Sequence, residues 1–311
     1  MNLYLKTHKD TALFSLRNPE YKTLVDFYLF GEMERDVLNG DITTESILKG
    51  KKEMRKAIIT AKSSGVFVGK QEVEYFLNSL KLRNEWKVSD GELIKKGKMI
   101  LEIEGEVDII LKVERVILNF IGRLSGVASL MHEYVQRVSS HILICPTRKT
   151  LWGLLDKKAC VLGGGGTHRL NLNSAVLMKE NHISLFKDRN ILGLKEVINE
   201  LDSKRAEMTN SLRFIEIEVE NEKEFFDSLE VLKDLKNIQG VIMFDNFTPE
   251  EIKRILKKSE DKKLNSKIVF EASGGITLDN VRQFGMTEVN IISVGAITHS
   301  AKNFDFSLRI V

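Results

Sequence analysis

The second half of the chain alternates short, almost wholly apolar runs with stretches of helical periodicity, and this pattern constrains the fold more than any other feature. An unbroken apolar run is typical of a strand buried on both faces, and such strands alternating with helices predict a parallel sheet, either open or closed into a barrel. Thr248-Pro249-Glu250-Glu251 marks the start of one intervening helix, because it offers a capping hydroxyl, a proline and a carboxylate to the first turn. The runs are HILICP (141–146), AVLMK (175–179), RFIEIEV (213–219), GVIMFD (240–245), KIVFEAS (267–273) and VNIISVG (289–295).

The first half follows a different pattern. Between Ser63 and Val107, short alternating runs with the turn signals Asp90-Gly91 and Glu104-Gly105 predict a small β-rich module. From 107 to 138 the apolar residues recur at helical spacing, which predicts one long helix. A chain of 311 residues is long enough for two domains.

Composition and charge exclude several classes of protein. With 42% hydrophobic and 29% charged residues and a net charge of only +3, the chain has a soluble globular composition without the basic excess of a nucleic-acid binder. The N-terminus lacks the pattern of a signal peptide, and no apolar run approaches the roughly 20 residues that cross a membrane, so we expect a cytoplasmic protein. Cys145 and Cys160 lie among apolar residues and are predicted to be buried free thiols.

Polar residues follow the apolar runs, where parallel strands end and active sites of such folds are built. One group is cationic and suits a planar carboxylate or a phosphate: Arg148, Lys149, Arg169 and Lys179, together with His168. Between 141 and 190 eight Lys and Arg residues face three Asp and Glu residues, so the positive charge is local. The sequence therefore predicts a polyanionic substrate.

Two further groups have more than one interpretation. Glu218 and Asp245 end neighbouring strands, where they could hold Mg²⁺ or bind ribose hydroxyls; alternatively, Glu216, Glu218 and Glu220 are one face of an edge strand. Ser273, Gly274, Gly275 and Gly295 leave backbone N–H groups uncovered that could bind a phosphate, although a glycine pair is also an ordinary turn. The run Gly163–Gly166 indicates close backbone approach to a site, and no nucleotide-binding glycine motif is present.

The ordered motifs resemble one family. The stretch TRKTLWGLLDKKACVLGGGGTHRLNLNSAVLMKENH (147–182) resembles the signature of the quinolinate phosphoribosyltransferases, also called carboxylating nicotinate-nucleotide pyrophosphorylases. The resemblance covers nearly the whole chain through GDITTESI (40–47), SDGELIKKGKMILEIEG (89–105), VERVILNFIGRLSGVAS (113–129), EIEVEN (216–221), MFDNF (243–247), EASGGIT (271–277) and ISVGAITHSAKNFDFSLRI (292–310). The stretch before GDITTESI has no role that we can assign.

The resemblance implies an α/β fold with two domains. Residues 1–126 would form an N-terminal α/β sandwich, to which the C-terminal strand 303–311 returns, and residues 127–302 would form an incomplete α/β barrel. It also implies a homodimer, or a higher oligomer, in which each barrel is completed by the partner's N-terminal domain. The implied reaction converts quinolinate and phosphoribosyl pyrophosphate to nicotinate mononucleotide, CO₂ and pyrophosphate, with Mg²⁺ as cofactor, in NAD biosynthesis.

The resemblance also implies roles for residues. The quinolinate carboxylates would be held by a cationic set to which the neighbouring subunit contributes one arginine: Arg148, Lys149, His168, Arg169 and Lys179, with Arg115 across the dimer interface. Phosphoribosyl pyrophosphate would be held by Lys179, Glu218, Asp245, Ser273, Gly274, Gly275 and Gly295, with Glu218 and Asp245 binding Mg²⁺ directly or through water. Glu218 or Asp245 would offset charge on the ribose, and Lys149 would assist decarboxylation.

Three departures from the family pattern touch the pocket: Leu151-Trp152 replaces a common Thr-Pro, Thr167 a common Asn, and Ser174 a common Asp. None removes a residue with an assigned charge. Two other classes were weighed. A non-catalytic relative, like the molybdenum-transport-associated proteins of this fold, would bind an anion without turnover. A lipoyl or biotinyl carrier hairpin over 89–105 would need a modifiable lysine at its tip, where Glu104-Gly105 is expected instead.

Overall fold

The structure is a computed structural model that describes residues 7–186, 190–204, 212–261 and 268–311. The chain divides into two compact units that interleave along the sequence. The barrel unit comprises Met1–Asp10, Glu133–Lys149 and Gly165–Ala296, and the sandwich unit comprises Thr11–His132, Thr150–Gly164 and Ile297–Val311. Each unit is described by itself. Lys187, Asp188 and Arg189, which contribute to the local charge count above, lie outside the described residues.

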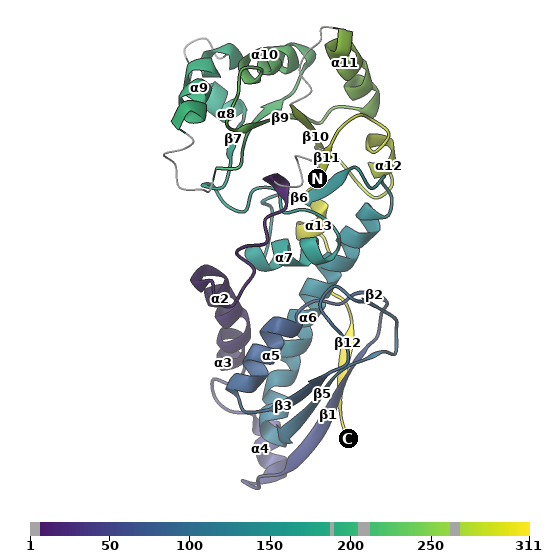
Figure 1. The fold of residues 1–311 in the computed structure, drawn as a ribbon. Coiled ribbons are helices and arrows are strands. Elements are labelled where there is room, and N and C mark those ends of the chain that lie inside the picture. The colour runs from purple at the N-terminus through teal and green to yellow at the C-terminus, as the bar shows by residue number, and fades with distance from the viewer. Residues whose placement is uncertain (1–6, 187–189, 205–211, 262–267) are drawn as a thin grey trace. The chain divides into compact units, whose positions relative to one another are not determined.

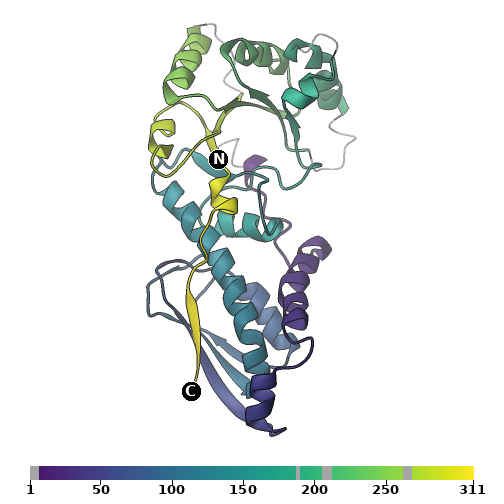
Figure 2. The same cartoon turned by 180° about the vertical axis from the view of Figure 1, so that it is seen from behind.

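The sandwich unit is built on an antiparallel four-stranded sheet in the order β12-β1-β5-β3, and its helices lie on one side of the sheet (Figures 1 and 2). The C-terminal strand thus pairs with β1, as in the register Ile59 to Leu308. The strands are β1 (Met54–Ala61), β2 (Gly65–Val66), β3 (Arg83–Trp86), β4 (Leu93–Ile94), β5 (Met99–Glu106) and β12 (Phe306–Ile310). The helices are α2 (Pro19–Asp26), a π-helical turn (Phe27–Gly31), α3 (Glu32–Asp36), α4 (Ile42–Leu48), α5 (Lys70–Ser79), α6 (Val107–Val135), whose last turn lies in the barrel unit, and α7 (Leu154–Leu162).

One turn prediction in this unit is wrong. Asp90-Gly91 does form a turn, in which Gly91 has a φ of +84°. Glu104-Gly105, however, lies inside strand β5. A Cβ atom on Gly105 would overlap the side chain of Leu82, so this glycine is required by close packing and not by a turn. The carrier hairpin with a tip at 104–105 is therefore excluded as well.

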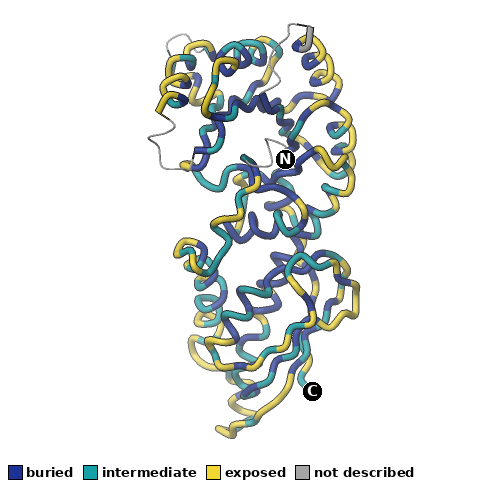
Figure 3. The backbone as a smooth tube through the Cα atoms, in the orientation of Figure 1, coloured by how far each residue is buried: buried dark blue, intermediate teal, exposed yellow. Residues whose placement is uncertain are grey.

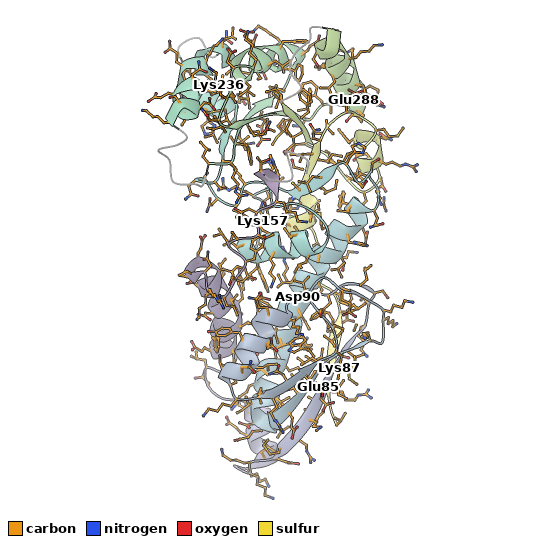
Figure 4. The ribbon with its side chains drawn as sticks, viewed as in Figure 1. Glu85, Lys87, Asp90, Lys157, Lys236 and Glu288 are labelled. Atoms are coloured by element: carbon orange, nitrogen blue, oxygen red, sulfur yellow. The ribbon has the colours of Figure 1, made fainter. Side chains whose placement is uncertain are left out.

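A buried polar network links α5 and α7 within the sandwich unit. The Lys158 ammonium lies 2.6 Å from Glu72 and 3.5 Å from Asp90, and Tyr21 donates a hydrogen bond of 2.8 Å to Glu72. Asp90, labelled in Figure 4, also accepts hydrogen bonds from the N–H groups of Gly69 and Lys70 at the start of α5. These partners compensate the charges that burial removes from water.

The barrel unit is built on six parallel strands in the order β6-β11-β10-β9-β8-β7. Because β6 and β7 are edges and are not paired with each other in the described chain, the barrel is incomplete. The strands are β6 (Leu143–Pro146), β7 (Val176–Met178), β8 (Phe214–Val219), β9 (Gln239–Asp245), β10 (Val269–Ser273) and β11 (Ile291–Val294). The helices are α8 (Glu180–Ile183), a 3-10 turn (Ile191–Leu194), α9 (Lys195–Ser203), α10 (Glu222–Leu232), α11 (Pro249–Asp261), α12 (Val281–Phe284) and α13 (Ala296–His299), which ends in the sandwich unit.

The strands are buried on both faces, as Figure 3 shows for the sheet of the barrel unit. Their inner faces form layers. The lowest layer is an apolar cluster of Leu143, Cys145, Ala175, Phe214, Val241, Val269 and Ile291. Because side chains alternate along a strand, the next inner positions on β8 and β10 are Glu216 and Glu271, and the positions after those are Glu218 and Ser273. Polarity therefore increases toward the carboxyl ends of the strands.

The fold class predicted from the sequence is confirmed: an α/β protein with an N-terminal sandwich and a C-terminal incomplete barrel. Each of the six apolar runs contains a strand, and the helix predicted at Thr248-Pro249 begins at Pro249. Thr248 Oγ1 accepts from the Glu251 N–H, and Glu251 accepts in return from the Thr248 N–H, which completes a capping box. Both cysteines are free and buried. Among the described residues, no helix has the length and apolar character of a membrane span.

Candidate active site at the strand ends of the barrel unit

Five adjacent strands of the barrel unit end in polar residues or glycine. Because the strands are parallel, these ends meet at one edge of the sheet. They carry Lys179 after β7, Glu218 in β8, Asp245 in β9, Ser273 in β10 and Gly295 after β11. Ser273 and Asp245 are paired in register. The structure therefore brings together the five strand-end positions that the sequence predicts.

Lys179 and Glu218 form an ion pair across β7 and β8. The Glu218 side chain is only 11% exposed, whereas that of Lys179 is 44% exposed, so the ammonium lies toward solvent and remains accessible to an anion. Strand β8 lies between β7 and β9, which shows that the alternating glutamates do not belong to an edge strand. Glu216 and Glu218 instead face the interior of the barrel unit.

The surroundings of Glu218 are acidic. A cavity of about 410 Å³ is lined by Glu180, Glu218, Glu220, Glu224 and Asp227, among others. Burial raises the pKa of Glu220, and the neighbouring charges of Glu180 and Glu224 raise it further. The acids outnumber the nearby cations, which are Lys223 in the lining and Lys179 paired with Glu218, so the surroundings are acidic overall.

Arg148 and Arg169, in contrast, form a cationic environment. Burial lowers the pKa of Arg169, and the charge of Arg148 lowers it further, so the two guanidinium groups lie close enough to repel each other. Among the described residues, neither arginine forms an ion pair with an acid. The charges of Glu216 and Glu218 raise the pKa of Arg169 but do not outweigh burial and Arg148, so the two guanidinium groups are only partly compensated and are suited to an anion with two acidic groups. Lys149 is exposed next to Arg148, and its N–H donates to Thr147 Oγ1 over 3.2 Å.

His168 lies one layer below the strand ends. Its Nε2 is 3.2 Å from Glu271 Oε1 and 3.3 Å from Glu216 Oε2, and all three side chains are buried. Burial alone lowers the pKa of His168, but the charges of Glu271 and Glu216 outweigh it and raise the pKa to about 9. Nδ1 accepts a hydrogen bond of 2.8 Å from the Arg169 N–H, so this ring and the arginine are held as one element.

The turn after β10 is fixed against β9. The Asn246 N–H donates to the Ser273 carbonyl over 3.0 Å, and Gly274 has a φ of +87°. A Cβ atom on Gly274 would lie 2.6 Å from the backbone nitrogen of Asn246, so only glycine fits there. Gly275 has a φ of +61°, and no atom lies within 4 Å of the place where its Cβ would be. The turn is packed against Asn246 at Gly274 and has free space beside Gly275, as a site that binds phosphate through backbone N–H groups requires.

Arg115 lies elsewhere, on α6 in the sandwich unit. Its side chain is 66% exposed and lines a cavity of about 440 Å³ together with Tyr28, Phe120 and Trp152. Its predicted contribution to the site of a neighbouring subunit stays a prediction. The glycine run is close-packed: a Cβ on Gly163 would overlap the carbonyl of Ala128.

Sequence reasoning missed two buried members of this region, Glu271 and His8. Glu271 is an acid inside the apolar run KIVFEAS, which was a signal that a buried cation or proton faces it. His8 precedes all recognisable motifs and carried no signal. Glu216 was seen only as one of three alternating acids.

The fold and the site define a class: an α/β protein whose parallel strand ends carry cationic and acidic groups at one edge of the sheet. Two family models match the chain, the quinolinate phosphoribosyl transferase N-terminal domain at residues 41–125 and the C-terminal domain at residues 127–309. The chain belongs to the quinolinate phosphoribosyltransferase family.

Individual proteins agree with this assignment. A probable carboxylating nicotinate-nucleotide pyrophosphorylase of Methanocaldococcus jannaschii is 39% identical, with 90% of this chain and 94% of the relative covered. Its counterpart in Bacillus subtilis is 34% identical, with 93% and 92% covered. The crystal structure of a nicotinate-nucleotide pyrophosphorylase from Ehrlichia chaffeensis superposes with a TM-score of 0.77 at 33% identity, with 91% of this chain and 97% of that chain covered.

Proposed function

We propose that this protein transfers the phosphoribosyl group of phosphoribosyl pyrophosphate to the nitrogen of quinolinate and releases CO₂ and pyrophosphate, with nicotinate mononucleotide as product. Family membership supports the reaction class. The single structural observation that carries the proposal is that Arg148 and Arg169, neither of which forms an ion pair with an acid among the described residues, lie in the barrel unit close enough for the charge of Arg148 to lower the pKa of Arg169. A dicarboxylate relieves their repulsion because each planar guanidinium can donate two parallel hydrogen bonds to one carboxylate.

The carboxylates of quinolinate are assigned to the cationic set Arg148, Lys149, Arg169 and Lys179, with Arg115 supplied by a neighbouring subunit of a homodimer. His168, which is buried below them with Nε2 facing Glu271 and Glu216, is assigned to the support of Arg169. The pyridine nitrogen attacks the anomeric carbon, and the bond to pyrophosphate breaks as the ribose gains positive charge. Glu218 and Asp245 are assigned to offset that charge and to accept hydrogen bonds from the ribose hydroxyls. Holding both reactants in register supplies much of the rate enhancement.

Decarboxylation follows from the product of the first step. The alkylated ring nitrogen is cationic and stabilises the carbanion that remains when the 2-carboxylate leaves as CO₂. Lys149 is exposed beside Arg148 and is our candidate for the group that assists near that carboxylate. A proton then replaces CO₂ at the same carbon.

The donor set fits Mg²⁺, which prefers hard oxygen ligands and keeps most of its water. Glu218 and Asp245 offer carboxylates at neighbouring strand ends, and the acids around Glu220 make the surroundings favourable for a cation. Bound there, Mg²⁺ would neutralise part of the charge on pyrophosphate. The open turn Ser273–Gly275, with Gly295, is assigned to the 5′-phosphate because its backbone N–H groups are approachable.

The test is direct. Purified protein is mixed with quinolinate, phosphoribosyl pyrophosphate and Mg²⁺, and nicotinate mononucleotide, CO₂ and pyrophosphate are measured by chromatography and coupled assays. We expect all three products in equal amounts, and little product when nicotinate replaces quinolinate. Binding of quinolinate without turnover would indicate a non-catalytic relative, and preference for nicotinate would contradict the proposed acceptor.

A further inference from the structure

The N-terminal segment Thr7–Asp10, for which the sequence analysis finds no role, lies inside the barrel unit beside β6 (Figures 1 and 2). It holds the backbone of the loop that carries His168. The carbonyl of His8 accepts hydrogen bonds from the Thr167 N–H at 2.7 Å, the His168 N–H at 3.2 Å and Thr167 Oγ1 at 3.0 Å. Asp10 N–H donates to Thr167 Oγ1 over 3.1 Å, and the Asp10 carboxylate lies 2.7 Å from the Arg213 guanidinium.

The fit between the segment and the loop is close. A Cβ atom on Gly166 would lie 2.7 Å from the His8 carbonyl oxygen and 2.7 Å from Cys145 Sγ, so the loop approaches the segment only because a glycine stands there. His168 itself has a φ of +52°, a left-handed conformation that a non-glycine residue adopts at a cost. The three hydrogen bonds to one carbonyl offset that cost and fix the direction of the His168 side chain.

The His8 side chain also contacts the residues that surround His168. The ring is fully buried and stacks on Phe214, with centroids 4.0 Å apart and planes at 17°. Its Nε2 lies 4.0 Å from Glu271 Oε2, while the other oxygen of Glu271 lies 3.2 Å from His168 Nε2. Glu271 therefore lies between two imidazole rings, that of His8 from the N-terminal segment and that of His168 from the candidate active site.

A space-filling role alone does not explain a histidine at position 8. The ring stacks on the apolar Phe214, but it also lies against the His168 ring, with centroids 5.4 Å apart, and faces Glu271, so its surroundings are partly polar. A phenylalanine or leucine would fill this space without the cost of burying a polar ring. An apolar residue lacks both ring nitrogens: Nδ1, which lies 2.8 Å from Thr7 Oγ1, and Nε2, which faces Glu271 at 4.0 Å.

We propose that His8 is a positioning residue for the proposed reaction. Through its carbonyl it holds the Thr167–His168 backbone, and its ring, whose Nε2 lies 4.0 Å from Glu271, limits the space in which Glu271 and His168 can move. Orientation of His168 matters because its Nδ1 lies 2.8 Å from the backbone nitrogen of Arg169, one of the two arginines assigned to the dicarboxylate. The expected change in KM rests on the proposed function. The expected fixed orientation of the His168 ring does not depend on the proposed function.

Another chemistry fits the same atoms. His8, His168 and Glu271 each offer one donor atom, and these atoms lie within 4.8 Å of one another, which is compatible with a transition-metal ion. A bound metal would hold His168 by coordination instead of by a carboxylate. The experiment must therefore distinguish the two.

Two substitutions separate the ring nitrogen from the ring itself. His8→Phe keeps the stack on Phe214 and removes the nitrogen, and His8→Gln restores a polar group that can reach Glu271. His141→Phe, at an exposed histidine before β6, is the matched control. Thr167→Val tests the backbone clamp separately, because it keeps the volume and removes both hydrogen bonds of the hydroxyl. Kinetics are measured for each substrate, and His168 is observed by ¹⁵N NMR with His168→Gln for assignment.

We expect His8→Phe to raise the KM for quinolinate severalfold, because the 4.0 Å contact of His8 Nε2 with Glu271 is lost, with the KM for phosphoribosyl pyrophosphate unchanged. His8→Gln should recover most of the loss, and His141→Phe should match wild type. Thr167→Val should raise the same KM. In spectra recorded at a pH above the folded pKa of about 9, where the ring is neutral, His168 should change from one tautomer in wild type to an average of two in His8→Phe.

Three outcomes overturn the proposal: a lower active fraction of His8→Phe with both KM values unchanged, an unchanged His168 spectrum, or one equivalent of a transition metal in purified wild type that His8→Phe lacks. The spectra need no turnover. If wild type does not convert quinolinate, the proposed function fails, while the NMR result still decides whether His8 positions His168. If His8→Phe does not fold, Thr167→Val supplies the same two readouts.

Discussion

Raising the pH should loosen the barrel unit selectively through His168. In the folded protein the charges of Glu271 and Glu216 outweigh burial and raise the pKa of His168 from 6.5 to about 9. A group whose pKa is raised by folding contributes its full stabilisation below the unfolded pKa and loses it as the pH rises through the folded pKa. The window in which His168 loses its contribution is therefore pH 6.5 to 9.

The magnitude follows from two opposing contributions. A shift of about 2.5 units, at about 1.36 kcal/mol each, corresponds to about 3 kcal/mol. The fully protonated ring, however, cannot accept at Nδ1, so it loses the hydrogen bond from the Arg169 N–H, which costs about 1 kcal/mol. About 2 kcal/mol remains. Glu216, whose pKa is raised to about 7 chiefly by burial, adds a loss of the same sign at lower pH.

The assay must report on the barrel unit by itself. Both tryptophans, Trp86 and Trp152, belong to the sandwich unit, so their fluorescence does not report on the barrel strands. Native-state hydrogen exchange resolves the difference: peptides from β8 and β10 are compared with peptides from β1 and β5 between pH 6.5 and 9.5. His168→Gln removes the titrating group, and His141→Gln is the exposed control.

We expect the opening free energy of β8 and β10 in wild type to fall by about 2 kcal/mol more than in His168→Gln across this window, with β1 and β5 unaffected. The reasoning would be refuted by equal losses in wild type and His168→Gln, or by a loss confined to the sandwich unit. Equal losses would mean that the ring remains neutral between the two carboxylates and that Arg169 N–H keeps its bond to Nδ1.

Three further predictions concern separate parts of the chain. Arg169→Ala should raise the KM for quinolinate about 10- to 100-fold, as expected for lost hydrogen bonds to a charged group, with native circular dichroism; wild-type kinetics would contradict the site. Gly274→Ala should raise the KM for phosphoribosyl pyrophosphate, whereas Gly97→Ala, with a similar φ of +88° and no neighbouring atom within 4 Å, should not; equal kinetics of the two variants would contradict the phosphate assignment. Burial raises the pKa of the Cys160 thiol well above its usual range, so neither it nor the buried Cys145 should react with a thiol reagent until the protein unfolds; rapid labelling of native protein would contradict this.

How far the sequence predicts the fold depends on whether a signal is local. The six apolar runs are strands because burial on both faces of a covered parallel sheet demands continuous apolar sequence, and that demand is visible in each run alone. Gly105 was misread because a glycine beside an acid looks like a turn, and only the distant Leu82 reveals that it is a packing glycine. The interleaving of the two units, in which 150–164 leaves the barrel unit, also depends on long-range contacts.

The same distinction applies to the candidate site. Residues at strand ends were predictable because topology alone brings them to one edge of the sheet. The residues of the layer below were not predictable. His168 lies buried between Glu216 and Glu271 because its own backbone, in a loop, has a left-handed conformation. His8 lies 160 residues from His168 in sequence, and no periodicity relates the two positions.

The departure Leu151-Trp152 shows how the chain compensates for a missing proline. The N–H groups of Leu151 and Trp152 both donate to Asp156 Oδ2 at 3.0 Å, and Arg123 forms a bidentate pair with the same carboxylate at 3.0 and 2.8 Å. A proline at position 152 has no N–H and could not make one of these bonds. The Trp152 ring also stacks on Tyr28, with centroids 4.1 Å apart. Hydrogen bonds and stacking therefore replace the rigidity of a proline ring, so the substitution changes how this segment is held and leaves every charge assigned to the substrates in place.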